Sequence, residues 1–334
     1  VTKELVNNKE GYRLKAGECR WEIEPQVLLD AQYGISVRSK ADFILWPVKE
    51  SEGQKPIAIF TDGFMYHKDK VADDTLKREA IRRSGRFRVW VLTWKDVQNV
   101  FQVEGDYATP TLIPERMPSG IQIYRSTVMN GNAQDLRPDK LGTFELLAYY
   151  LQNKNAEQLF TIHAKAYAMS LLNPKDIGNS IVFADWRHQI EPILNIFSLR
   201  DTGFALEDTM FGKWIPNPSG ADLTILAGVA SSDLQQNRIN ATLMVCALLN
   251  DIKEKRSEKY EAEWNGFWQF FNMMQFLPGF VAVSTEGMSG MVYDAIPQKE
   301  DLEITVEQRP SDQAWEETLA QVFDDAAKEC ACTL

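Results

Sequence analysis

The strongest constraint in this sequence is the apolar run PIAIF at residues 56–60, which ends at once in Thr61, Asp62 and Gly63. A short apolar run closed by an Asp-Gly turn is typical of a strand buried on both faces. The run ADFILW at residues 41–46 precedes it, with a turn-like segment between the two. We predict a hairpin that brings Asp42, near the start of one strand, beside Thr61 and Asp62 at the end of its neighbour.

The residues at this strand end form a pattern suited to metal-dependent chemistry. Two carboxylates, Asp42 and Asp62, with the backbone carbonyl of Thr61 make a hard oxygen site that suits Mg²⁺ or Mn²⁺. His67 follows five residues after Asp62 and titrates near neutral pH, so it can serve as general acid or base. Taken singly, each residue is as well explained as a cap, turn or core residue, and only the combined spacing favours a site.

A basic helix is predicted next. Asp73 or Asp74 can cap its N-terminus, Gly85 can end it, and a buried stripe is expected at Leu76, Ala80 and Ile81. Four basic side chains stand away from this stripe and can hold the phosphates of DNA: Lys77, Arg78, Arg82 and Arg83. Residues 87–94 then predict a closing strand.

Charge is distributed unevenly along the chain. Residues 1–100 hold 18 basic and 15 acidic side chains, whereas the remainder holds 18 and 32. Eight basic and four acidic residues between Lys68 and Arg88 suit contact with a polyanion, or equally a solvated helix face. Four Cys and three His without a CxxC pair exclude a zinc module, and no apolar run is long enough to span a bilayer. We expect a cytoplasmic protein without a membrane segment.

The order of these features resembles a known family. The Asp-Phe pair at Asp42, the strand ending in FTDGFMYH at 60–67, the segment DTLKR at 74–78 and a Ser-Gly before a Val-rich strand are similar to the very-short-patch-repair branch of the PD-(D/E)XK nucleases. The resemblance covers about residues 20–100. It implies a restriction-endonuclease-like α/β fold, with a mixed sheet and flanking helices, that hydrolyses DNA phosphodiester bonds with a metal ion.

The resemblance also implies roles for individual residues. Asp42 would ligate the metal ion, the carbonyl of Thr61 would complete the inner shell, and His67 would act in cleavage. Asp62 stands where the wider superfamily has its motif lysine, and Phe60 stands where it has a second acidic residue. We therefore predict Asp42, Asp62 and His67 as catalytic, and Mg²⁺ (or Mn²⁺) held by Asp42, Thr61 and Asp62.

The second part of the chain carries weaker signals. Residues 101–140 are rich in turn formers and predict a linker or surface elaboration, and residues 141–334 predict a second, α+β domain of support or interaction. Its expected helices are 141–152, 155–172, 257–275 and 312–332, and its expected strands are 181–184, 223–230 and 279–284. The aromatic cluster at residues 264–271 predicts a packed helix core, because acidic neighbours would repel nucleic acid.

A broader resemblance links the whole chain to larger proteins. Neither GxxxxGK[ST] nor GxGxxG occurs, and the chain ends inside the amphipathic pattern at 312–332, so we expect a piece of a longer polypeptide. The nuclease-like module, the segment WNGFWQFFN at 264–272 and a terminal helix resemble the tail of large bacterial anti-phage defence helicases of the Druantia type. This resemblance implies DNA, the remainder of a helicase and other defence proteins as partners.

Three functions follow and stay open at this point. The first is DNA hydrolysis, the second is a catalytically inactive module that binds or positions DNA for an attached motor, and the third is a protein-interaction platform on the acidic part. Of the other candidate residues, His163 is expected to be a buried structural residue and His188 to have no catalytic role. Cys330 and Cys332 are expected to be inert thiols.

Overall fold

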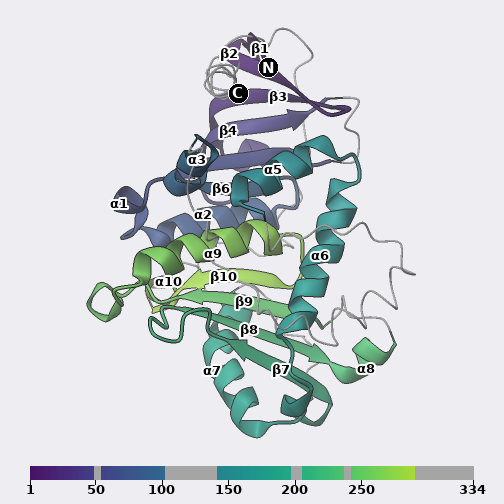
Figure 1. Cartoon of the computed structure of the whole chain (residues 1–334), viewed down its shortest axis with the longest axis vertical. Coiled ribbons are helices and arrows are strands. Elements are labelled where there is room, and N and C mark those ends of the chain that lie inside the picture. The colour runs from purple at the N-terminus through teal and green to yellow at the C-terminus, as the bar shows by residue number, and fades with distance from the viewer. Residues whose placement is uncertain (49–53, 102–140, 197–204, 237–241, 290–334) are drawn as a thin grey trace.

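The computed structural model describes residues 1–48, 54–101, 141–196, 205–236 and 242–289. These residues form a six-stranded sheet from the first hundred residues and a four-stranded sheet from the second half, with helices packed against both (Figure 1). The expected α/β class, with mixed sheets and flanking helices, is confirmed. Among the described residues, no helix is long and apolar enough to cross a membrane.

The six-stranded sheet keeps its strands in chain order. Pairing is antiparallel from β1 to β5 and parallel between β5 and β6, because α2 crosses over between those two strands. The predicted hairpin is confirmed as the β4–β5 pair. The elements of this half are β1 Thr2–Val6, β2 Lys9–Ala16, β3 Cys19–Leu29, β4 Ser39–Pro47, β5 Ile57–Asp62, α1 Phe64–His67, α2 Val71–Arg83, β6 Arg88–Thr93 and α3 Trp94–Phe101.

Helix α2 begins earlier than its sequence pattern predicts. Lys70 is the N-cap residue, so Asp73 and Asp74 lie in the first turn, where the helix dipole favours acidic side chains. The C-terminal end agrees with the prediction, since Gly85 adopts a left-handed φ of 71° just after the helix. The expected stripe of Leu76, Ala80 and Ile81 is buried.

The four-stranded sheet has the order β10-β9-β8-β7, with β9 and β10 parallel and the other pairs antiparallel. The strands expected at 223–230 and 279–284 are β8 and β10, but the strand expected at 181–184 is wrong. That segment belongs to α7. The prediction failed because a four-residue apolar run fits a helix as well as a strand. The elements are α5 Thr143–Gln152, α6 Ala156–Leu171, α7 Ser180–Ile196, β7 Thr209–Trp214, β8 Leu223–Ala230, α8 Ser231–Gln235, β9 Met244–Leu249, α9 Tyr260–Met274, β10 Phe280–Ser284 and α10 Thr285–Ser289.

Three of the four helices expected in this half are confirmed. They are α5, α6 and α9, each within three residues of its expected ends. The helix expected at 312–332, the predicted linker at 102–140 and the two C-terminal cysteines lie outside the described residues.

The two sheets share one topology. In each, two antiparallel pairings lead to a strand, a crossover helix and a final parallel strand: β3-β4-β5-α2-β6 in the first and β7-β8-β9-α9-β10 in the second. The crossover helices α2 and α9 lie between the sheets (Figure 1), and each packs against the last strand of the other sheet.

Helix α9 covers the free edge of β6. The side-chain amide of Asn272 accepts from the Val91 N–H at 2.8 Å and donates to the Val91 carbonyl at 2.7 Å. Gln275 makes the same pair of bonds with Val89, accepting from its N–H at 2.8 Å. These amides replace a neighbouring strand, so the buried edge keeps its backbone hydrogen bonds.

Helix α2 covers the free edge of β10 in the same way. Glu79 accepts from the Ala282 N–H at 3.1 Å, and Arg82 donates to the Phe280 carbonyl at 2.6 Å. Glu79 and Arg82 are three residues apart, as are Asn272 and Gln275, so each pair lies on one face of its helix. The two halves are thus joined by reciprocal side-chain caps on their edge strands.

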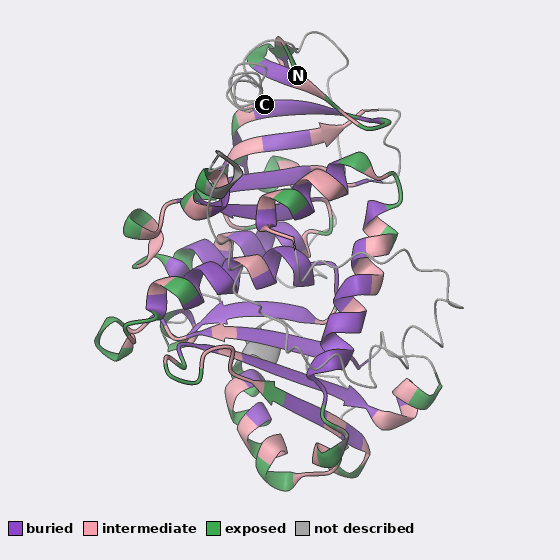
Figure 2. Ribbon diagram, viewed as in Figure 1, coloured by how far each residue is buried: buried purple, intermediate pink, exposed green. Residues whose placement is uncertain are grey.

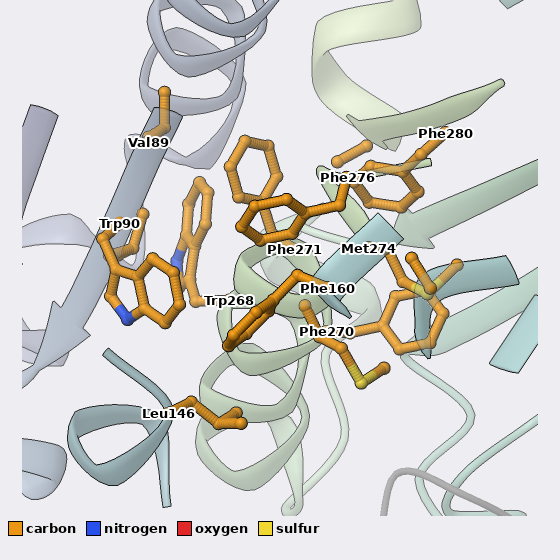
Figure 3. Close-up of a cluster of buried hydrophobic side chains, with 14 of the residues drawn as sticks. Val89, Trp90, Leu146, Phe160, Trp268, Phe270, Phe271, Met274, Phe276 and Phe280 are labelled. Atoms are coloured by element: carbon orange, nitrogen blue, oxygen red, sulfur yellow. The ribbon is translucent and has the colours of Figure 1, made fainter. Parts of the chain in front are cut away.

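The hydrophobic core runs between the sheets without a break. One cluster of buried side chains contains residues of both sheets and of α5, α6 and α9, and strands such as β8 and β10 are buried along most of their length (Figure 2). Trp90 of β6, Phe160 of α6 and Phe276 meet at its centre, with ring centroids 4.8–6.5 Å apart (Figure 3). The aromatic cluster at 264–271 is fully buried, which confirms its predicted place in the core.

Candidate functional site

The candidate site lies where β5 ends. Because β5 and β6 are parallel, their carboxyl ends meet at one edge of the sheet, with Asp62 opposite Thr93. The chain leaves β5 through Gly63, forms the short helix α1 and returns as α2, so His67 and the first turn of α2 face the end of the strand. The end of β5, helix α1 and the first two turns of α2 therefore supply Asp62, His67, Asp74 and Arg78.

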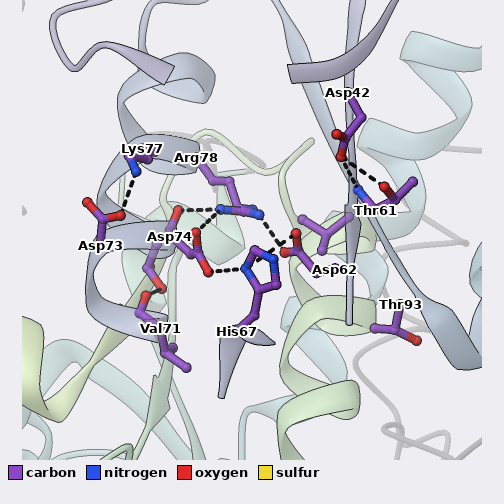
Figure 4. A network of polar contacts seen from close by, with 12 residues as sticks. Asp42, Thr61, Asp62, His67, Val71, Asp73, Asp74, Lys77, Arg78 and Thr93 are labelled. Carbon is purple, nitrogen blue, oxygen red and sulfur yellow. Dashed lines mark hydrogen bonds and ion pairs between the residues drawn. The ribbon is translucent and has the colours of Figure 1, made fainter. Parts of the chain in front are cut away.

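Four side chains form a compact charge network: Asp62, His67, Asp74 and Arg78 (Figure 4). Arg78 donates from Nη2 to Asp62 Oδ2 at 2.5 Å, and its Nη1 lies 3.1 Å from Asp74 Oδ1. His67 Nδ1 lies 2.7 Å from Asp74 Oδ2 and 3.6 Å from Asp62 Oδ1. Arg78 and Asp62 are buried, whereas 27% of the His67 side chain is exposed, so the network opens to solvent at the imidazole.

The electrostatics of the network follow from burial and pairing. The hydrogen bond with Asp74 raises the pKa of His67, which keeps its imidazole protonated to higher pH. Burial raises the pKa of Asp62 in spite of the nearby Arg78. Burial also acts to raise the pKa of Asp74, but the Arg78 charge and the His67 hydrogen bond outweigh it, so this pKa is lowered. Burial thus dominates at Asp62, whereas pairing with Arg78 and His67 dominates at Asp74.

Arg78 is held by more than its ion pairs. Its guanidinium carbon lies 4.4 Å from the ring centre of Phe60 on β5 and 4.9 Å from the ring of Trp268 on α9. The side chain is fully enclosed, and its Nε has no hydrogen-bond partner among the described residues. Aromatic rings attract a guanidinium through their negative faces, so these two rings favour the charged group in a dry environment.

Asp42 lies beside the charge network and is held by the neighbouring strands. Its Oδ2 accepts from the Thr61 N–H at 2.7 Å and from the Thr61 hydroxyl at 2.9 Å. The register puts Phe43 opposite Ile59, so the neighbouring Asp42 reaches Thr61, the residue just before Asp62. The structure therefore brings Asp42, Thr61, Asp62 and His67 to one edge of the sheet.

Gln26 completes the surroundings of Asp42. It adopts a φ of 55° within β3, opposite Asp42, and donates to Asp42 Oδ1 at 3.3 Å. A left-handed residue inside a strand is strained, and such positions often accompany functional sites.

The donor atoms around these carboxylates determine where a cation fits. Asp62, His67 and Asp74 offer ligand atoms within 4.8 Å of one another, but Arg78 already pairs with both carboxylates of that group. Asp42 Oδ1 accepts from Gln26, and Asp62 Oδ1 lies 3.6 Å from His67 Nδ1. Among the described residues, the group with closely spaced ligand atoms does not include Asp42, the first predicted metal ligand.

The predicted row of phosphate-binding residues is only partly at the surface. Arg78 belongs to the charge network and Arg82 to the β10 cap, and both are buried, so the expectation that they face DNA is wrong. Arg83 pairs with Glu79 and is mostly covered. Lys77 pairs with Asp73 at 2.5 Å and keeps 30% of its side chain exposed, so it is the most accessible of the four.

Three residues of this region carry roles that the sequence did not indicate. Asp74, expected as a helix cap, is the partner of His67, and its position one turn before Arg78 is the only local signal of that role. Trp268 and Gln26 reach the site from distant segments, and nothing in the sequence links them to it. His163 is buried as expected, and His188 is exposed. Compared with protein-family models, curated proteins and solved structures, the chain gives no significant match.

Proposed function

We propose that the first half of this chain is a restriction-endonuclease-like module that hydrolyses DNA phosphodiester bonds with a divalent cation. The observation that carries the proposal is the His67–Asp74 pair, 2.7 Å apart, at the strand end that also holds Asp42 and Asp62. An acid/base group oriented by a carboxylate, next to hard oxygen donors, is the minimum that metal-assisted phosphoryl transfer requires.

The proposed roles follow from the atoms that remain accessible. His67 uses Nδ1 for Asp74, so its other nitrogen, Nε2, exchanges the proton with the substrate. The raised pKa favours the protonated imidazole near neutral pH, which suits donation to the leaving oxygen. Asp74 orients the ring, and Arg78 pairs with Asp62 and favours the ionised form of Asp74.

Asp42 and Asp62, with the carbonyl of Thr61, are the residues that would hold Mg²⁺ or Mn²⁺. When bound, the ion would activate water and neutralise charge on the phosphoryl oxygens. Lys77 can contact the DNA backbone from the exposed side of α2. As part of a larger defence helicase in the cytoplasm, the module would cut DNA that the motor delivers, and that wider context rests on sequence resemblance alone.

The test is cleavage of DNA by the purified chain with Mg²⁺ or Mn²⁺. We expect nicking that requires the metal ion and that Asp42→Ala and His67→Ala each reduce by at least about a hundredfold. The matched control is Asp73→Ala, which removes an exposed carboxylate of α2 outside the charge network and should leave the rate within about twofold. Metal-independent nicking, or equal loss in the control, would exclude this site as its source.

A second candidate function is a catalytically inactive DNA-binding or positioning module. The observation that favours it is the ion pair of Arg78 with Asp62, which balances a site carboxylate without any metal ion. This function predicts DNA binding that weakens steeply with salt and no cleavage with any divalent metal. Measuring DNA binding and DNA cleavage on the same preparation distinguishes the two candidate functions.

A further inference from the structure

Helix α9 of the second half presents three aromatic side chains to the site region at intervals of four residues: Tyr260, Trp264 and Trp268, here called the aromatic stripe. Residues four apart lie on one helix face, so the stripe is a single surface. All three side chains are buried, with Trp264 and Trp268 fully enclosed. The stripe lies more than 170 residues after the strand end in the chain, yet it reaches both elements that follow β5.

The first part of the stripe holds α1, the helix that carries His67. Phe64 of α1 packs its ring edge-on against Trp264, with centroids 5.5 Å apart, and lies 6.0 Å from the ring of Tyr260. The Tyr260 hydroxyl donates to the carbonyl of Lys68, the residue directly after α1, at 3.2 Å. A four-residue helix has little stability of its own, so these contacts with α9 fix its position.

The last part of the stripe holds Arg78. The Trp268 ring covers one side of the guanidinium and Phe60 approaches it from β5, which leaves the side chain fully buried. Arg78 in turn binds Asp62 and Asp74, the two carboxylates that face His67. The charged groups around His67 therefore come from β5 and α2, and the ring that confines their shared cation comes from α9.

We propose that the aromatic stripe positions the site: Trp264 sets the place of α1, and Trp268, acting through Arg78, sets the geometry of the His67–Asp74 pair. The second half of the chain then helps to build the site and is not a separate support domain. Trp268 is a positioning residue, because it contacts Arg78 and no atom that would react. This inference gives the second half a role in the hydrolysis proposed above, but its structural part stands without cleavage.

The test compares Trp268→Met, which removes the aromatic face, with Trp268→Phe, which keeps an aromatic face in a smaller side chain. The readout is the proton NMR resonance of His67 Nδ1–H, which a hydrogen bond to Asp74 shifts far downfield, recorded at one fixed pH below neutrality. His67→Gln assigns the resonance. We expect Trp268→Met to lose or broaden it and Trp268→Phe to retain it. Trp186→Met is the control, because Trp186 is equally buried but packs against β7 and β8.

A second pair of variants keeps the inference testable if Trp268→Met does not fold. Trp264→Met should displace α1 and thereby weaken the His67 resonance, whereas Trp264→Phe should retain it. An unchanged His67 resonance in folded Trp268→Met or Trp264→Met would overturn the proposal, as would equal loss in Trp186→Met.

The kinetics of DNA cleavage test the positioning role independently. In an active preparation, Trp268→Met should lower kcat about tenfold to a hundredfold with little change in KM, since misplacing a catalytic group has effects of this size. If the parent chain does not cleave DNA while the His67 resonance follows the expected pattern, the proposed reaction fails and the positioning role stands. If it cleaves DNA and folded Trp268→Met keeps its kcat, the positioning role fails alone.

Discussion

Neighbouring residues of α2 have opposite environments, which shows how the fold divides one basic segment into two roles. Arg78 is enclosed between two aromatic rings and two carboxylates, whereas Lys77, one position earlier, forms a surface pair with Asp73. Successive residues of an α-helix are rotated by about 100° around its axis, so adjacent side chains face different surroundings. Burial therefore decides that one cation stabilises the site while the other stays open to a ligand.

The difference between these two cations predicts a difference in stability. We expect Arg78→Met to lower the free energy of unfolding by about 3–5 kcal/mol, because it leaves the buried carboxylates of Asp62 and Asp74 without their cation. Lys77→Met is the matched control and should change it by less than about 1 kcal/mol, since exposed ion pairs contribute little. Urea unfolding at neutral pH measures both, and similar values for the two variants would contradict this account of the charge network.

At the scale of elements, each of the two crossover helices supplies hydrogen-bond partners to the edge strand of the other sheet. A final parallel strand leaves one edge without a partner, and in this chain both such edges are buried against the other half. Side chains of α9 cap β6 and side chains of α2 cap β10. Because buried backbone groups must keep hydrogen-bond partners, these polar residues belong to the fold rather than to a ligand site.

This capping can be tested at Asn272. We expect Asn272→Leu to lower the free energy of unfolding by about 2–6 kcal/mol, because it leaves the N–H and carbonyl of Val91 unsatisfied at about 1–3 kcal/mol each. The Val91 amide should also exchange with solvent faster. Gln269→Leu, on the same helix at a half-buried position, is the control and should change stability by less than about 0.5 kcal/mol. Unchanged exchange at Val91 would show that the edge is satisfied without the amide.

At the scale of the molecule, the two sheets share one core. The hydrophobic cluster includes residues of both halves, and Arg88 of β6 forms a bidentate ion pair with Glu157 of α6. α2 and α9 each pack on both sheets, so neither half covers its inner surface alone. Such an arrangement predicts cooperative unfolding of the described residues as one unit.

Two buried thiols report on this cooperativity. Cys19 lies in β3 of the first sheet and Cys246 in β9 of the second, and both thiols are buried. With Cys330 and Cys332 replaced by Ser, brief thiol labelling across a urea series should give the same midpoint for Cys19 and Cys246. Midpoints that differ by more than about 0.5 M would show that the halves unfold separately.

The sequence by itself determined the local elements around the site. The apolar runs at 41–46 and 56–60 predict the paired strands, and the helical spacing of α2 predicts its buried stripe, because periodicity acts over a few neighbouring positions. The buried aromatic residues of α9 were predictable for the same reason. The metal ion, the DNA substrate and the helicase context stay predictions.

Only the tertiary structure decided what these elements do for one another. Asn272 meets Val91 across 181 positions of the chain, and the Trp268 ring meets Arg78 across a similar span. No local pattern encodes such contacts, so the sequence does not distinguish the basic residues of α2, two of which are buried against the second half of the chain. The partner of His67 depended in the same way on how α1 and α2 fold back over β5. Long-range packing assigns each side chain its surroundings, and those surroundings set its charge state and its role.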